Sequence, residues 1–331
     1  GVAATAVAAA SNGLIAAARG TDALVWRKPT DRPVTIGAGG LLLDLSVSDD
    51  GKTLAASTQN GDVLVAAVPG AVRRLSPRNA SVIEPVVGVA LSPDGTKLAA
   101  SLQNGDVLLQ TAHASRLGSP LPSDSAQPPF ALDLALSPDG RTLAAGRRDG
   151  TIALWDVDKQ RLLGKPLRAS QDFVRSVAFS PDGKVLASAS GGTRVQLWNV
   201  GSRTAAGEPL QAGEGVTAVR FSPDGWLLVA GTTGGSIVLF DVQGRQQLGE
   251  PLHGHDGSVF SVAFAGNGMR VVSGGNDGRV LLWSVEPWAS GQALRDRACN
   301  LVGRNLTRSE WKQYLPGKSY RRTCAQWPAG S

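Results

Sequence analysis

The feature that most constrains this chain is a tight turn that recurs along most of its length. Four copies read Ser-Pro-Asp-Gly and begin at Ser92, Ser137, Ser180 and Ser222, and three looser versions end at Gly13, Gly51 and Gly268. The glycines that close these seven turns follow one another at intervals of 38 to 45 residues. Repeats of about 40–45 residues, with four short strands each, are typical of β-propellers. One such unit cannot bury both of its faces, so seven units predict seven blades in a closed ring.

The most complete unit runs from Gly254 to Val285. Its segments Val259 to Ala265 and Arg279 to Val285 alternate apolar and polar residues, and Arg270 to Ser273 is a short β-branched run. This pattern predicts three strands, separated by turns rich in Asn and Gly. A fourth strand is needed to complete the unit. In other units it is marked by a proline, as in Gly207 to Leu210, which suits an outer edge strand without a second neighbour.

The third predicted strand ends at an aromatic residue in five units. These residues are Trp26, Trp155, Trp198, Phe240 and Trp283, whereas the second and third units place Ala66 and Gln110 there. The turn before that strand carries Asp149 or Asp277 in two units, and Gly192 or Gly234 in two others.

The unit from Gly254 to Val285 resembles a WD40 repeat, because Gly254-His255 precedes its first strand and Trp283 lies near the end of its third. The resemblance implies an all-β fold, a seven-bladed WD40 β-propeller with a short, mainly helical C-terminal extension. It also implies a buried hydrogen-bond chain through His255, Ser273, Asp277 and Trp283. The rival interpretation, in which His255 and Asp277 form a catalytic or metal-binding pair, is weaker because both residues lie in a strand-turn context.

Counting strands leaves the seventh unit incomplete. The first unit begins near Thr5 and the third strand of the seventh ends near Val285, so no fourth strand is evident for the last blade. In WD40 proteins an N-terminal segment often supplies that strand. Here the strand is expected either upstream of Gly1 or in the tail, where Ser319 to Thr323 is our candidate.

Residues 1–285 are expected to form the propeller, and residues 286–331 a C-terminal extension packed on it. Apolar residues between Trp288 and Val302 fall close to helical spacing, and Thr307 to Glu310 reads as a capping box that opens a second helix. The only cysteines, Cys299 and Cys324, lie in this extension. They form a disulfide in an oxidising compartment or remain small buried thiols in a reducing one.

The basic charge is concentrated in the extension. The chain carries a net charge of +6, and residues 286–331 hold eight Lys and Arg against three acidic residues. The repeats are therefore nearly neutral, so nucleic-acid binding through the basic tail is only an alternative function. No run of 18 apolar residues predicts a transmembrane segment in this fragment. We expect a cytoplasmic protein, or an extracytoplasmic one if the cysteines form a disulfide and an upstream anchor has been removed.

No motif typical of a catalytic site is evident in the sequence. The three histidines are His113, His253 and His255, and none belongs to a phosphate loop, a nucleophile elbow or a calcium loop. We therefore predict no enzyme activity, no cofactor and no metal. The alternative, a propeller hydrolase or lyase with a metal in the channel, would need His and carboxylate side chains that converge there.

Function is then expected at a surface. In WD40 proteins partners commonly dock on the top face, around the channel, through positions that begin each first strand and precede the turn Asp. By resemblance these positions are Leu41, Leu43, Gln59, Val87, Gln103, Phe130, Leu132, Arg148, Phe173, Arg175, Thr217, Thr233, Ser258, Phe260 and Asn276. Blades 2 to 5 are expected to expose an apolar arc, comprising Leu41, Leu43, Val87, Phe130, Leu132 and Phe173. Arg148 and Arg175 edge this arc, as at a protein-binding hot spot.

The tail resembles the segment that closes WD40 arrays at the C-terminus of large bacterial signalling proteins. Those proteins carry STAND-type NTPase, protein-kinase, TIR or caspase-like domains upstream. The resemblance implies a non-catalytic interaction or sensing module, monomeric in isolation, whose partner is another protein or an upstream effector domain of the same chain. The chain begins at Gly1 and its only Met is Met269, which suggests a piece of a longer protein.

Overall fold

The computed structural model describes residues 2–68, 70–76, 84–286, 305 and 307–314. It divides into two compact units, Gly1–Ser284 and Val285–Ser331. The predicted helix before Val302, both cysteines and the candidate strand Ser319 to Thr323 lie outside the described residues. Within the described part, no helix has both the length and the apolar character that a membrane span requires.

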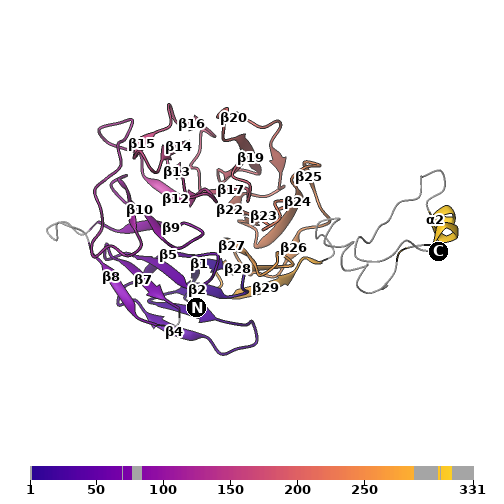
Figure 1. Cartoon of the computed structure of the whole chain (residues 1–331), viewed down its shortest axis with the longest axis horizontal. Coiled ribbons are helices and arrows are strands. Elements are labelled where there is room, and N and C mark those ends of the chain that lie inside the picture. The colour runs from indigo at the N-terminus through magenta and orange to yellow at the C-terminus, as the bar shows by residue number, and fades with distance from the viewer. Residues whose placement is uncertain (1, 69, 77–83, 287–304, 306, 315–331) are drawn as a thin grey trace. The chain divides into compact units, whose positions relative to one another are not determined.

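The first unit consists of seven antiparallel sheets, arranged around a common centre in chain order (Figure 1). Sheet 1 contains β1 (Ala4–Ala9), β2 (Ile15–Arg19), β3 (Asp22–Trp26) and β4 (Val34–Gly37). Sheet 2 contains β5 (Leu42–Val47), β6 (Thr53–Thr58), β7 (Val63–Ala67) and β8 (Val72–Leu75), and sheet 3 contains β9 (Val86–Leu91), β10 (Lys97–Leu102) and β11 (Val107–Thr111).

The remaining sheets follow the same order. Sheet 4 contains β12 (Ala131–Leu136), β13 (Thr142–Arg147), β14 (Thr151–Asp156), β15 (Arg161–Leu162) and β16 (Leu167–Arg168). Sheet 5 contains β17 (Ser176–Phe179), β18 (Val185–Ala189), β19 (Arg194–Asn199), β20 (Thr204–Ala205) and β21 (Leu210–Gln211). Sheet 6 contains β22 (Val216–Phe221), β23 (Leu227–Thr232), β24 (Ser236–Asp241), β25 (Gln246–Gln247) and β26 (Leu252–His253), and sheet 7 contains β27 (Val259–Ala265), β28 (Arg270–Gly275) and β29 (Val280–Ser284).

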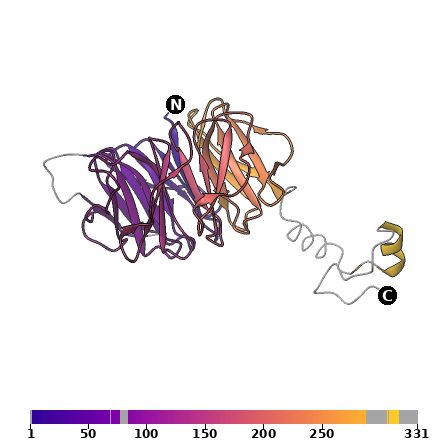
Figure 2. The same cartoon turned by 90° about the horizontal axis from the view of Figure 1, so that it is seen from above.

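The ring is closed. The first strand of each sheet packs against the first strand of the next, and β27 of the last sheet packs against β1 of the first. Seen at right angles to Figure 1, the sheets stand side by side around the centre (Figure 2). The seven-bladed propeller predicted from the repeats is therefore confirmed.

The core lies between neighbouring blades rather than inside any one of them. One cluster joins Ala16 and Val25 of blade 1 to Leu45 and Leu54 of blade 2, and another joins Val7 of blade 1 to residues of blade 7. Alanines such as Ala16 are fully buried on the second strands. Small side chains on both faces allow the sheets to approach closely, and each blade is completed by its neighbours.

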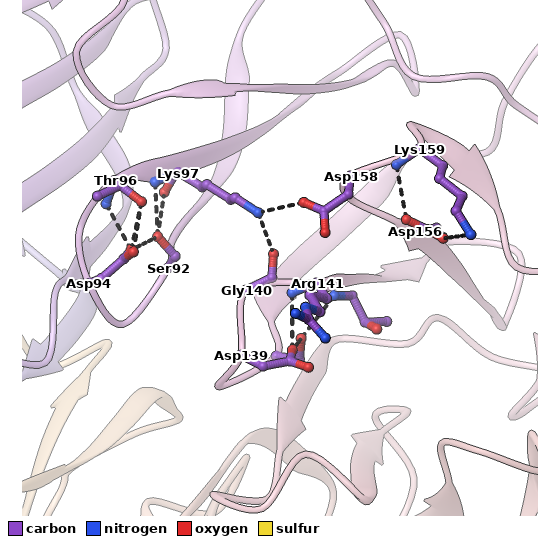
Figure 3. Close-up of polar contacts among 12 residues, drawn as sticks. Ser92, Asp94, Thr96, Lys97, Asp139, Gly140, Arg141, Asp156, Asp158 and Lys159 are labelled. Atoms are coloured by element: carbon purple, nitrogen blue, oxygen red, sulfur yellow. Dashed lines mark hydrogen bonds and ion pairs between the residues drawn. The ribbon is translucent and has the colours of Figure 1, made fainter.

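Side-chain hydrogen bonds hold the conformation of the Ser-Pro-Asp-Gly turns (Figure 3). Ser92 Oγ donates to Asp94 Oδ1 at 2.5 Å and accepts from the backbone N–H of Lys97 at 2.9 Å. The backbone N–H of Thr96 donates to the same carboxylate. These hydrogen bonds, that of the Ser92 hydroxyl first, lower the pKa of Asp94 below its ordinary value. Lys97 then links two blades, because its Nζ reaches the carbonyl of Gly140 at 3.0 Å.

The outer strands are less regular than predicted. In blades 4, 5 and 6 each outer strand is split into two short pieces on either side of the Gly-x-Pro segment, because proline cannot donate to the ladder. The prediction of four strands is wrong for the third unit. On the outer side of β11, the described residues form only an isolated bridge between Leu108 and Pro120. Buried Leu117 and Leu121 fill the space beside it.

The seventh blade contains three strands among the described residues, and no outer strand pairs with β29 there. Leu282 of β29 is 41% exposed. In the second unit, α2 (Arg308–Tyr314) is capped as predicted. The backbone N–H of Thr307 donates to Glu310 Oε2 at 2.8 Å, and the N–H of Glu310 donates to Thr307 Oγ1 at 3.2 Å.

Candidate functional site

Four polar side chains of blade 7 lie in one chain of hydrogen bonds, as the resemblance implies. His255 Nδ1 lies 3.0 Å from Asp277 Oδ1, and His255 Nε2 lies 2.7 Å from Ser273 Oγ. Trp283 Nε1 donates to Ser273 Oγ at 2.8 Å. An ionised carboxylate only accepts, so Nδ1 carries the proton and Nε2 accepts from the Ser273 hydroxyl. Each donor in this buried chain has an acceptor, which favours a structural role.

The environment of Asp277 keeps its carboxyl ionised. Burial alone would raise the pKa of Asp277, but hydrogen bonds from His255 and from the backbone N–H groups of Arg279 and Asp256 lower it to about 2. A lowered pKa contributes stability above the ordinary value of 3.8, and this contribution is lost as the pH falls toward about 2.

Replacing Asp277 by alanine is expected to reduce the free energy of unfolding by about 2 kcal/mol at neutral pH, because His255 is left buried without its acceptor. The difference from the unchanged protein should shrink as the pH falls below about 4. Denaturant unfolding at several pH values measures it. Asp149→Ala is the matched control, because Asp149 occupies the same turn position in blade 4 but is exposed and, among the described residues, bonds only Thr151. An equal loss in both variants would contradict the network.

The predicted partner-binding positions lie at one end of the sheets, where the first strands begin; this end is the top face. Five backbone hydrogen bonds join the start of a first strand to the residue before the turn: Gln59 to Leu41, Gln103 to Pro85, Arg148 to Phe130, Thr233 to Gly215 and Asn276 to Ser258. Leu43, Val87, Leu132, Thr217 and Phe260 occupy the shifts in register that follow. Such β-bulges turn a side chain away from the regular ladder.

The apolar arc expected on blades 2 to 5 is more broken than predicted. Leu41 and Phe173 are 39% and 38% exposed, and Phe260 of blade 7 is 40% exposed. The other arc members, Leu43, Val87, Phe130 and Leu132, are half-buried. The physical reason is that neighbouring first strands pack directly against one another, which covers part of the residues between them.

Two arginines accompany this surface. Arg148 is exposed, and its guanidinium carbon lies 4.9 Å from the centroid of the Phe173 ring. Arg175 is also exposed and lies beside Gly191. Blade 5 departs from the pattern of the others, because β17 begins at Ser176 and the N–H of Arg175 donates to the carbonyl of Ala189. The guanidinium of Arg148 therefore covers one face of the Phe173 ring.

The centre of the ring contains charged residues that the sequence analysis missed. A cavity of about 380 Å³ lies between the first strands and is lined by residues that include Asp44 and Arg220. Asp44 Oδ2 accepts from the N–H of Val89 at 3.0 Å, which joins blade 2 to blade 3. Asp133 Oδ2 accepts from the N–H of Val177 at 2.9 Å, which joins blade 4 to blade 5. These carboxylates therefore bind neighbouring blades together.

Arg220 lies beside Asp133. Its Nη1 is 3.5 Å from Asp133 Oδ2 and donates to Ser176 Oγ at 3.0 Å. Removal from water, together with the negative charge of Asp133, raises the pKa of Asp44 to about 7, although the hydrogen bond from Val89 and the charge of Arg220 act in the opposite direction. In the part of the chain that the structure describes, no group of three or more His, Cys, Asp and Glu side chains could hold a metal ion.

The family model of the WD domain, G-beta repeat, matches residues 128–156, 162–199 and 246–284. These three segments of the propeller match the WD40 repeat. Each matched segment ends one residue beyond a tryptophan of a third strand, Trp155, Trp198 or Trp283. No curated protein sequence matches the chain significantly.

The WD40 hydrogen-bond chain is complete in blade 7 and partial in the other matched blades. In blade 5, Trp198 Nε1 donates to Ser188 Oγ at 2.9 Å, but Ser170 and Gly192 stand where His and Asp are found in blade 7. In blade 4, Trp155 Nε1 donates instead to the carbonyl of Pro122 at 2.8 Å. The channel carboxylates could have been suspected only because Asp44 and Asp133 interrupt otherwise apolar strands.

Proposed function

We propose that this WD40 propeller is a non-catalytic protein-protein interaction or sensing module of a larger bacterial signalling protein. Partners bind on the top face. The observation that carries the proposal is the exposure of Leu41, Phe173 and Phe260, three large apolar side chains that all occupy top-face positions. The WD40 propeller is a fold that protein-interaction modules typically have.

The chemistry of the top face supports this proposal. Exposed aromatic side chains with arginine at their edge are the residues that contribute most to protein interfaces. Phe173 and Arg148 form such a pair, and Arg175 adds a second cation in blade 5. Leu41, Phe173 and Phe260 lie on blades 2, 5 and 7, so a partner that contacts all three would cover this end of the ring.

The larger assembly is part of the proposal. The resemblance of the tail to segments that close bacterial WD40 arrays favours an upstream effector domain of the same chain as the partner, held inactive until a ligand arrives. Residues 286–331 would then pack on the propeller as a C-terminal extension, and the module would act in the cytoplasm. The near neutrality of the repeats favours a protein partner over nucleic acid.

Exchanging both Phe173 and Phe260 for alanine is expected to weaken partner capture by the full-length protein about tenfold or more, because both exposed rings lose their contact area. Quantitative affinity capture, with the melting temperature measured in parallel, tests this. The double variant Val34→Ala with Val72→Ala is the control, since both valines are exposed on outer strands away from the top face. Equal capture by all three proteins would refute the top-face proposal.

A further inference from the structure

We infer that a pocket in blade 5 binds an oxyanion group, a carboxylate or a phosphate, through Arg194. The pocket has a volume of about 540 Å³. Polar side chains line it, namely Ser170, Ser190, Thr193, Arg194 and Gln196, around the bare backbone of Gly192. Among the residues that the structure describes, no acidic side chain lines it, and the only full charge there is that of the Arg194 guanidinium.

The pocket lies where blade 7 holds its His-Asp pair. The register of β18 with β19 matches that of β28 with β29, so Gly192 corresponds to Asp277 and Arg194 to Arg279. Ser170 corresponds to His255, because each follows the last outer strand of the preceding blade and its backbone N–H donates to a turn glycine of that blade. Blade 5 has therefore lost both side chains that fill this space in blade 7.

A third position, next to the lost imidazole, also differs between blades 5 and 7. In blade 7, a Cβ on Gly275 would lie 2.6 Å from His255 Nδ1, so only glycine fits there. Ser190 occupies the corresponding position of blade 5 and lines the pocket. Because blade 5 has no imidazole here, there is room for a side chain at this position.

Blade 5 has an arginine, Arg194, at the position of Arg279, but it has no carboxylate at the two positions that pair with Arg279 in blade 7. In blade 7, Arg279 Nη2 lies 3.0 Å from Asp256 Oδ2, and Arg279 Nε lies 3.9 Å from Asp277 Oδ2. The corresponding residues of blade 5 are Gln171 and Gly192. Arg194 forms no ion pair or side-chain hydrogen bond with the residues that the structure describes. A free guanidinium beside serine and threonine hydroxyl groups suits a carboxylate or phosphate, which takes two parallel N–H bonds from it.

The neighbouring blades fill the corresponding space with their own side chains. In blade 6, Glu214 accepts a hydrogen bond from Thr232 Oγ1 at 2.5 Å, and Ser236 Oγ lies 2.9 Å from His253 Nδ1. In blade 4, Arg147 Nη1 pairs with Asp124 Oδ1 at 2.7 Å. Blade 5 thus differs from blades 4 and 7, where Arg147 and Arg279 pair with aspartates, in leaving its arginine without an internal anion.

The test titrates the whole protein at low ionic strength with two probes, inorganic phosphate and N-acetyl-aspartate amide, measures their affinity by calorimetry and follows the Arg side-chain N–H signals by NMR. N-acetyl-asparagine amide is the neutral control. Saturable shifts of the Arg194 signal with either anion are expected, and the stronger probe identifies the oxyanion. Arg194→Gln should weaken the binding about tenfold or more, because the charge-assisted pair is lost. The matched change Arg279→Gln in blade 7 should leave it unaltered.

A second variant separates binding from folding. Gly192→Asp restores the carboxylate of blade 7, and a Cβ at Gly192 would meet no atom within 4 Å. The new carboxylate should occupy Arg194, abolish the binding of both anions and leave the melting temperature unchanged or higher. The inference is overturned if neither anion binds the unchanged protein, if Arg279→Gln weakens binding as much as Arg194→Gln, or if Gly192→Asp binds as before. Because Phe173 and Phe260 do not line the pocket, their alanine variants should bind both anions normally, so this test is independent of the top-face proposal.

Discussion

Replacing Trp155 by alanine is expected to reduce the free energy of unfolding by about 3–5 kcal/mol, which is the usual cost of removing a large aromatic side chain from a core. Trp155 is 1% exposed, and its indole N–H donates to the carbonyl of Pro122. The guanidinium carbon of Arg147 lies 5.5 Å from its ring centroid. The variant would therefore open a cavity and leave Pro122 without its donor.

The same substitution at Trp26 is the control for this experiment. Trp26 ends β3 of blade 1 as Trp155 closes the corresponding strand of blade 4, but it is only half-buried. Denaturant unfolding should show a clearly smaller loss for Trp26→Ala. Equal losses would mean that the register position, rather than the packing around it, determines the contribution of the aromatic residue.

Replacing Asp44 by asparagine is expected to stabilise the propeller in alkaline solution. The pKa of Asp44 is raised from 3.8 to about 7 in the folded chain. Between those values the folded state keeps a proton that the unfolded chain has lost, so the contribution of Asp44 to stability falls as the pH rises. An asparagine does not ionise, but its amide nitrogen cannot accept one of the two backbone N–H hydrogen bonds that Asp44 accepts. The variant should therefore be slightly less stable than the unchanged protein near pH 4, and its unfolding free energy relative to that of the unchanged protein should rise by up to about 4 kcal/mol between pH 4 and pH 8.

The sign of this effect distinguishes Asp44 from the second channel carboxylate. Asp133 lies 3.5 Å from Arg220 and accepts hydrogen bonds from Ser176 and the N–H of Val177. Asp133→Asn should therefore destabilise the protein near pH 8, because Arg220 loses its anion. Unfolding free energies of both variants across this pH range provide the measurement. A pH-independent effect of Asp44→Asn would show that Asp44 is ionised throughout.

Local sequence patterns predicted most of the architecture because a repeated unit states the same pattern many times. The Asp-Gly turns fix where strands reverse, and alternation fixes which residues face the neighbouring blade. The exceptions lie where a blade departs from its repeat. Pro120 and Pro122 replace an outer strand in blade 3, and the Gly-x-Pro segments split three others.

The candidate sites were less accessible to sequence reasoning. Alignment to the repeat located the top-face positions, but exposure depends on how closely two blades approach, so Phe130 and Leu132 are half-buried while Phe173 and Phe260 are exposed. The blade 5 pocket required a comparison in three dimensions. Gly192 reads as an ordinary turn glycine until its register shows that Asp277 occupies the same place in blade 7.

The sequence by itself determined the number of blades and the position of the turns, because the same local pattern recurs in every unit. The hydrogen-bonding residues of blade 7 followed from the resemblance of that unit to a WD40 repeat. Only the tertiary structure decided how the seven units meet. Asp44, Asp133 and Arg220 come from three blades, and they gather at the centre because ring closure brings distant first strands together. Ring closure likewise determines the exposure of each top-face residue, since that exposure depends on contacts with the next blade along the chain.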